Sequence, residues 1–220
     1  MNSFASVFTK SNLAYMMQGL LLTVEIAIAT IILSLIFGTI LALIKTYAKG
    51  KLKFLSYLTS AYIELFRCTP NLLWIYFIYF GLKGSQFVIG SLIFTVFTSA
   101  VVAEIVRGGL NAIPKGQFEG AASQGFNFFQ TLAYIVLPQT FKSIIPALLS
   151  QMTTVIKDTC YLRAVAIADF MWQGMVVIGQ YAKSFTQIIA VFGFMAAVYF
   201  LINFTMSVLI RKYQKRIMIQ

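Results

Sequence analysis

Long apolar segments alternate with short polar ones along the whole chain. Five of the apolar segments reach the length of about 20 residues that an α-helix needs to cross the hydrocarbon core of a bilayer. They cover 13–44, 55–82, 87–109, 140–162 and 185–210. Because these runs are continuous, they predict helices and not the short alternating strands of a membrane barrel. We therefore expect an all-α integral membrane protein with about five transmembrane helices and a single domain over residues 1–220.

The longest polar interruption, residues 110–138, separates the third segment from the fourth. Pro114 suits the beginning of a helix and Gly125 its end, so QFEGAASQ predicts a short helix with Glu119 near its N-terminus. Asn127 and Gln130 are spaced as a capping pair for a second, amphipathic helix. We expect Pro138 to separate that helix from the fourth span. By pattern alone, the loop is either a hairpin lying on the membrane or a docking element for a cytoplasmic partner.

Composition supports the placement of the chain in a bilayer, and the distribution of basic residues predicts its orientation across the membrane. Of all residues, 60% are hydrophobic and 10% are charged, with a mean hydropathy of +0.85. The net charge of +11 does not indicate a nucleic-acid partner, because the basic residues lie at segment ends and not on one basic face. An outward N-terminus places eleven basic residues inside: Lys45, Lys49, Lys51, Lys53, Arg107, Lys115, Lys142, Arg211, Lys212, Lys215 and Arg216. Only Lys10, Lys83, Arg163 and Lys183 are then outside, so we expect the 110–138 loop and the C-terminus in the cytoplasm.

Several kinds of chemistry have no motif in this sequence. There is no histidine, and Cys68 and Cys160 are far apart, so neither a metal site nor a disulfide framework is indicated. The GxxxxGK[ST] phosphate loop is missing, which means that any ATPase must be another chain. A GxSxG nucleophile elbow is missing as well, which argues against an intramembrane hydrolase.

Ordered motifs over nearly the whole chain resemble the membrane (permease) subunits of ABC importers, in the branch for polar amino acids. The motifs are EGAASQG followed by IVLPQ, then QGLLLTVEIA, YIELFRCTPNLLWIYFIYFGL, AEIVRGGLNAIPKGQ and IKDT. The resemblance implies a type I ABC importer permease fold, in which the loop is the EAA loop and its short helix is a cytoplasmic coupling helix. The chain departs from the family pattern at Gly120, where alanine is usual, and at Cys68, where glycine is common. The Gly120 departure lowers helix propensity by roughly 1 kcal/mol at an interior position, and Cys68 makes its backbone less permissive.

The resemblance also implies an assembly in the bacterial cytoplasmic membrane. Two ATP-binding subunits would use ATP and Mg, while this multi-pass chain would bind no cofactor itself. A second permease subunit, identical or related, and an extracytoplasmic substrate-binding protein would complete the complex, with membrane lipid around it. Coupling to the ATPase is expected from Gln117, Glu119, Gly120, Ala121, Ala122 and Gly125.

Two polar clusters inside apolar segments are candidates for substrate binding, because ionisable residues in a bilayer are costly. The first contains Glu64, Arg67, Thr69, Pro70 and Asn71. Pro70 breaks the helical hydrogen-bond ladder, and a guanidinium beside such a kink suits an amino acid's carboxylate. The equal alternative is a structural kink with an internal Glu64–Arg67 ion pair.

The second cluster is Lys157, Asp158 and Thr159, near the end of the fourth span. Asp158 is placed either to accept a substrate ammonium or to pair with Lys157 or Arg163. Other groups are assigned structural roles: a Glu104–Arg107 bridge, packing contacts at Gly38, Ala42 and Gly90, and an aromatic belt from Trp74 to Phe80. Glu25 receives no role.

The leading hypothesis is the translocating subunit of an ATP-driven importer for a polar amino acid, with no covalent chemistry of its own. Around the presumed substrate path, Arg67, Lys157 and Arg163 outnumber Glu64 and Asp158. This excess favours a glutamine- or glutamate-like substrate and leaves cystine open. An ion-coupled secondary amino-acid transporter is the alternative, although such proteins usually show paired repeats that this chain lacks. A purely structural membrane partner would not account for the charges within the spans.

Overall fold

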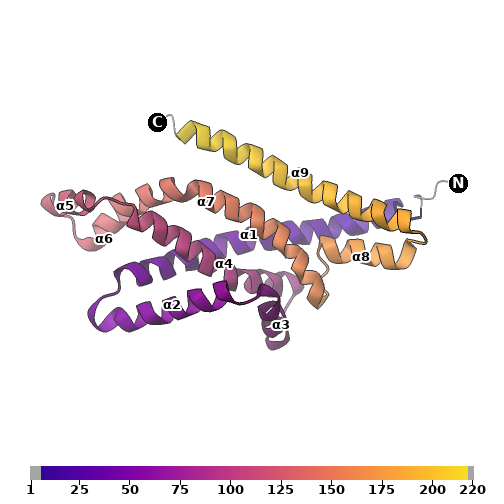
Figure 1. The fold of residues 1–220 in the computed structure, drawn as a ribbon, viewed down its shortest axis with the longest axis horizontal. Helices are drawn as coiled ribbons and strands as arrows, with labels where there is room; N and C mark the ends of the chain where they lie inside the picture. The colour runs from indigo at the N-terminus through magenta and orange to yellow at the C-terminus, as the bar shows by residue number, and fades with distance from the viewer. Residues whose placement is uncertain (1–5, 218–220) are drawn as a thin grey trace. The chain divides into compact units, whose positions relative to one another are not determined.

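The computed structural model describes residues 6–217, without the side chains of residue 213 and residues 215–217. The side chains of Lys215 and Arg216, counted above as cytoplasmic, therefore lie outside the described residues. All regular structure in the described part is helical (Figure 1), which confirms the all-α prediction. In chain order the elements are α1 (Lys10–Tyr47), η1 (Gly50–Leu52), α2 (Lys53–Cys68), α3 (Asn71–Gly81), α4 (Gln86–Asn111), α5 (Lys115–Ser123), α6 (Phe128–Thr131), η2 (Leu132–Val136), α7 (Leu137–Asp158), η3 (Thr159–Val165), α8 (Phe170–Tyr181) and α9 (Phe185–Ile217).

Within residues 6–217, four helical stretches are long and apolar enough to cross a membrane. They are Lys10–Tyr47, Gln86–Asn111, Phe128–Val165 and Phe185–Lys212. These stretches include four of the five segments expected from hydropathy. The segment expected over 55–82 is different, because it forms two shorter helices.

The break in that segment falls at Thr69 and Pro70. Helix α2 ends at Cys68, Thr69 is extended with φ −116° and ψ 150°, and α3 begins at Asn71. A residue before proline avoids the helical region, and proline has no N–H to donate. The break that Pro70 predicts is confirmed, but a continuous helix over 55–82 is wrong: α2 has 16 residues and α3 has 11.

Pro138 does not interrupt the helix that leads into the fourth span. Helices α6, η2, α7 and η3 follow one another directly, and Pro138 is the second residue of α7. The element η2 is a π-helical turn in which the Leu137 N–H donates to the carbonyl of Leu132, five residues back. This wider turn shifts the hydrogen-bond register just before the proline, so the chain stays helical where we expected a separation.

The chain divides into two compact units, each with its own core. One comprises 1–31, 71–94 and 152–220, and the other comprises 32–70 and 95–151. In the second unit, the core is formed by Ala42, Val102, Val106, Leu110, Leu132, Val136 and Ile144. A Cβ at Gly38 would lie 2.7 Å from Val102 Cγ1, so glycine lets α1 and α4 approach closely. The packing roles predicted for Gly38 and Ala42 are thus confirmed.

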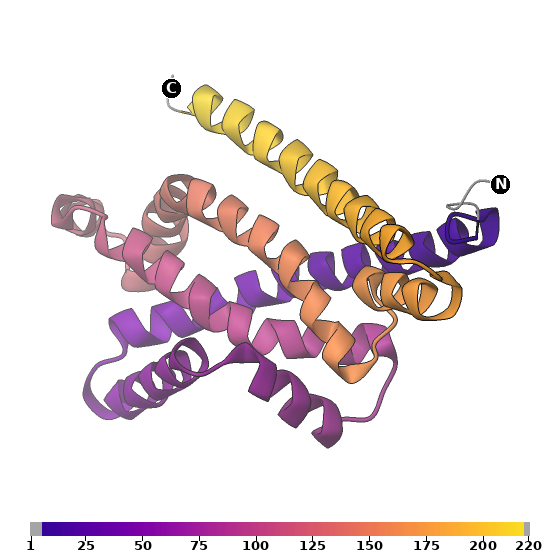
Figure 2. The same cartoon turned by 45° about the vertical axis from the view of Figure 1, so that its right-hand side comes forward.

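In the first unit, α8 packs between parts of α1 and α9. Its core consists of Val7, Met16, Phe170, Val177, Val191 and Met195. Figure 2 shows α8 beside the first turns of α9. Gly90 has the predicted packing role here, because a Cβ on it would lie 2.7 Å from Ile26 Cδ1. The helix α8 itself was not predicted, since the apolar segments on both sides dominate the hydropathy pattern.

Candidate coupling loop and substrate residues

Helix α5 is the short helix predicted in the polar loop. Its N-cap is Pro114, with extended backbone, and Gly125 follows its end with φ +81°, a conformation that favours glycine. Ala121 is buried, while the other expected coupling residues are exposed: Gln117, Glu119, Gly120, Ala122 and Gly125. Glu119 is the fifth residue of α5 and not part of its first turn, so its predicted place near the N-terminus is wrong. The helix is held on one side and presents a carboxylate and small residues on the other.

The loop is tied to its own unit by polar and aromatic contacts. Asn127 Oδ1 accepts from the Gln130 N–H, and Gln130 Oε1 accepts from the Asn127 N–H, both at 2.9 Å, which confirms the predicted capping pair. The side chain of Gln139 donates to Gln117 Oε1 at 3.1 Å. Tyr47, the last residue of α1, has its ring 5.3 Å from that of Phe128. These contacts join α6 to the end of α1 and α5 to the start of α7.

The packing of the described residues does not require a glycine at position 120. A Cβ on Gly120 would have no heavy atom of the described residues within 4 Å. By contrast, a Cβ on Gly109, at the end of α4, would lie 2.4 Å from Ile144 Cγ2. The outer side of α5 is therefore open at Gly120, where a side chain would meet only something outside the chain.

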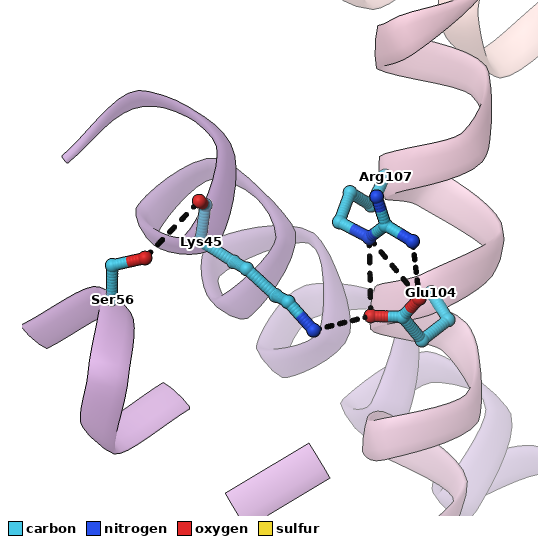
Figure 3. Close-up of polar contacts among 4 residues, drawn as sticks. All are labelled: Lys45, Ser56, Glu104 and Arg107. Atoms are coloured by element: carbon cyan, nitrogen blue, oxygen red, sulfur yellow. Dashed lines mark hydrogen bonds and ion pairs between the residues drawn. The ribbon is translucent and has the colours of Figure 1, made fainter. Parts of the chain in front are cut away.

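A three-residue ionic cluster joins the end of α1 to α4, the helix that leads into the loop (Figure 3). Glu104 Oε2 is 2.7 Å from Arg107 Nη2, which confirms the predicted bridge, and Glu104 Oε1 is 2.9 Å from Lys45 Nζ. The Ser56 hydroxyl donates to the carbonyl of Lys45 at 3.2 Å. The cluster thus links the end of α1 with α4 and the start of α2. Sequence spacing reveals an i,i+3 pair but not Lys45, which is 59 residues away from Glu104.

The first substrate candidate cluster surrounds the break between α2 and α3. Glu64, Arg67 and Pro70 are exposed, and Thr69 and Asn71 are half-buried. The Thr69 hydroxyl donates to the carbonyl of Leu65, at the end of α2. Both ion pairs of the described residues use Glu104, so the alternative of an internal Glu64–Arg67 pair is wrong. The guanidinium of Arg67 is accordingly available at the kink.

The second cluster lies where α7 tightens into the 3₁₀ turn η3. Lys157 is exposed, Asp158 is half-buried, and the buried Thr159 donates its hydroxyl to the Ile156 carbonyl at 2.8 Å. Asp158 forms no ion pair with Lys157 or Arg163 among the described side chains. Of these three residues, Lys157 alone lines a cavity of about 350 Å³, together with Cys160, Met171, Phe192, Met195, Ala196 and Tyr199.

Most of that cavity could not be found from sequence. Met171 belongs to α8 and Tyr199 to α9, whereas the predicted cluster names only residues of α7 and η3. Their contribution depends on how α8 and α9 pack, and no local spacing encodes it. The lining of this cavity is almost entirely apolar, and the exposed Lys157 is its one charged residue.

The chain matches the family described as "Binding-protein-dependent transport system inner membrane component" over residues 34–219. It is 33% identical to the "Probable glutamine ABC transporter permease protein GlnP" of Bacillus subtilis (strain 168), covering 97% of this chain and 98% of that one. It is 28% identical to the "Glutamate/aspartate import permease protein GltK" of Escherichia coli O157:H7, with 93% and 94% covered.

Two solved structures have the same fold. One is titled "Crystal structure of an amino acid ABC transporter with histidines", with TM-score 0.82, 26% identity, and 98% of this chain and 99% of that chain covered. The other is an inward-facing MetNI methionine ABC transporter, with TM-score 0.74, 19% identity, and 93% and 99% covered. The predicted type I importer permease fold is confirmed by these likenesses.

Proposed function

We propose, for this member of the family of binding-protein-dependent transport system inner membrane components, the function of the translocation subunit in an ATP-driven importer. The imported substrate would be a polar amino acid. The observation that carries the proposal is α5: a nine-residue helix with one buried side and an open side of small residues around Glu119. Small residues on the open side of the helix allow another protein surface to approach it closely.

The proposed partner of α5 is a cytoplasmic ATPase subunit. The sequence has no phosphate-binding loop, so ATP and Mg would be used by two copies of that subunit. The contacts of Tyr47, Phe128 and the Gln117–Gln139 pair would carry the movement of α5 into α1 and α7. A second permease subunit and an external substrate-binding protein would complete the assembly in the bacterial cytoplasmic membrane.

The substrate we propose is an amino acid with a polar side chain, of the glutamine or glutamate type. Relatives named for glutamine and for glutamate/aspartate transport support this class. Lys157 at the cavity and the unpaired Arg67 at the kink would bind carboxylates. The remaining proposed substrate residues are Glu64, Thr69, Pro70, Asn71, Asp158 and Thr159.

We further propose that the N-terminus lies outside and the C-terminus in the cytoplasm. The distribution of lysine and arginine supports this orientation, with eleven basic residues on one side and four on the other. The α5 loop would then face the compartment that supplies ATP. Residues 166–184, between the last two candidate spans, would face outward.

The test is uptake of labelled glutamine and glutamate into proteoliposomes that contain this chain, its ATPase and its binding protein. We expect uptake to require ATP inside the vesicle and to persist when ion gradients are collapsed. Uptake that follows a sodium or proton gradient without ATP would contradict the proposal and favour a secondary transporter. Substitution of Lys157→Gln, with Lys183→Gln as the control, then tests the substrate site separately.

A further inference from the structure

Asp169 is a fully buried carboxyl group at the beginning of α8. It is 0% exposed, and its Oδ1 accepts from the Trp172 N–H at 2.8 Å as the helix N-cap. Its second oxygen, Oδ2, is also buried and has no hydrogen-bond partner among the described residues. An ionised carboxylate normally satisfies both oxygens, so half of this group is left without the donor that a charge requires.

The surroundings of Asp169 form the joint between α8 and α1. A Cβ on Gly19 would lie 2.7 Å from the Asp169 carbonyl oxygen, so the two backbones touch here. The Gly19 N–H donates to Gln173 Oε1 at 3.1 Å, and the Phe170 N–H donates to Thr23 Oγ1 at 3.1 Å. The carboxyl group of Asp169 therefore lies within the contact that holds α8 against α1, and a charge on it would act on that contact.

No cation balances the carboxyl group within the described residues. The titratable groups that interact with it electrostatically are Cys160 of η3 and Tyr199 of α9, both neutral near pH 7. Among the other titratable and charged groups of the neighbouring elements, Glu25, Lys157, Tyr161, Arg163 and Tyr181 are exposed, and Tyr15 and Asp158 are half-buried. Both ion pairs of the described part lie elsewhere, at Glu104. The hydroxyl of Tyr199 is likewise buried without a hydrogen-bond partner.

We propose that Asp169 is a proton-binding site, at which a bound proton keeps α8 attached to α1. Protonation turns Oδ2 into a neutral hydroxyl that needs no counter-ion, and loss of the proton to water leaves a buried charge at the joint. This carboxyl lies between the candidate spans, and burial raises its pKa from 3.8 to about 7. Because the pKa in the folded chain exceeds the unfolded value, the joint is most stable below about pH 4 and weakens up to about pH 7.

The proposal goes beyond transport and is independent of which solute moves. It implies that α8 is poised to loosen at neutral pH and to tighten as the surrounding compartment acidifies. A group with an ordinary carboxyl pKa would be ionised throughout the physiological range and would not respond.

Trp172 provides a probe at the site. With Trp74→Phe as the background, Trp172 is the only tryptophan, because the chain contains two. We would titrate its fluorescence in lipid nanodiscs between acid and alkaline pH, in this background and with Asp169→Asn added. The expected result is one transition with a midpoint within about one unit of pH 7 that disappears in Asp169→Asn. A midpoint in the ordinary carboxyl range, or a transition that persists in Asp169→Asn, overturns the proposal.

A second measurement covers the case in which Asp169→Asn fails to fold. Infrared difference spectra of the unaltered chain between acid and neutral pH report the carbonyl stretch of protonated carboxyl groups. We expect a band that is lost around pH 7 and is retained at acid pH in Asp158→Asn. If the band is absent in Asp158→Asn, the proton belongs to Asp158. If the band of the unaltered chain disappears only in the ordinary carboxyl pH range, no carboxyl group has the raised pKa. Either result overturns the proposal.

Discussion

Lys45 Nζ lies 2.9 Å from Glu104 Oε1, joining the last turn of α1 to α4 across 59 residues of sequence. Glu104 also binds Arg107, so one carboxylate holds two cations (Figure 3). Its side chain is 17% exposed, which leaves it partly shielded from water. These ion pairs fix the end of α1 against α4, the helix that leads into the 110–138 loop.

Removing the shared carboxylate should destabilise the chain more than removing one cation. For Glu104→Gln we expect a loss of about 1–3 kcal/mol in the free energy of unfolding, because two partly shielded cations lose their partner. For Lys45→Met we expect less than about 1 kcal/mol. Denaturant unfolding in a fixed detergent measures both. Equal losses in the two variants would show that the Lys45 contact, and not the shared carboxylate, dominates.

The contact between Gly19 and Asp169 predicts a steric penalty. In Gly19→Ala, the added methyl group would lie 2.7 Å from a backbone oxygen that cannot move aside, with an expected cost of about 1–3 kcal/mol. Gly193→Ala in α9 is the matched control, because a Cβ there meets nothing within 4 Å. We expect the control to be neutral or to gain up to about 1 kcal/mol from helix propensity. Thermal unfolding of both variants compares them, and equal midpoints would contradict close α1–α8 packing.

Because the outer side of α5 is open at Gly120, we predict that a large side chain at this position weakens binding of the ATPase and leaves the fold intact. Gly120→Ala and Gly120→Trp should both leave the fold of the isolated chain intact, since a Cβ there touches nothing. Co-purification with the ATPase should survive in the alanine variant and drop at least about tenfold in the tryptophan variant, because a bulky group blocks a docked surface. Full recovery of the ATPase with Gly120→Trp would favour a loop that lies on the membrane.

Lys157 at the apolar cavity predicts a defect in substrate binding. Lys157→Gln removes the ammonium group but keeps a similar length, so we expect KM for uptake to rise about tenfold or more while ATP hydrolysis without substrate is unchanged. Lys183→Gln, an exposed-loop lysine, should behave as the unaltered chain. An unchanged KM in Lys157→Gln would remove this residue from the substrate path.

Local signals in the sequence predicted local structure well. The pair Glu104–Arg107, the cap Asn127–Gln130 and the break at Pro70 each depend on residues at most four apart. The joints made by Lys45 with Glu104 and by Gly19 with Asp169 connect residues that are distant in sequence, and no spacing reports them.

The differences at Pro138 and at α8 have identifiable physical reasons. Proline at position 138 normally ends a helix, but a π turn shifts the hydrogen bonds before it. Helix α8 was missed because its 12 residues are too short to stand out beside membrane-length segments. Its position also determines the cavity wall at Met171, so the sequence alone could not predict that lining.

The central claim is that α5 transmits the work of a separate ATPase to the membrane helices. It is tested most directly by substrate-stimulated ATP hydrolysis in proteoliposomes containing the whole complex, with Glu119→Lys compared with the unaltered chain. Lys83→Glu, an exposed charge reversal between α3 and α4, is the control. We predict that Glu119→Lys abolishes stimulation while the complex stays assembled and that Lys83→Glu does not. Full stimulation in Glu119→Lys would contradict the account.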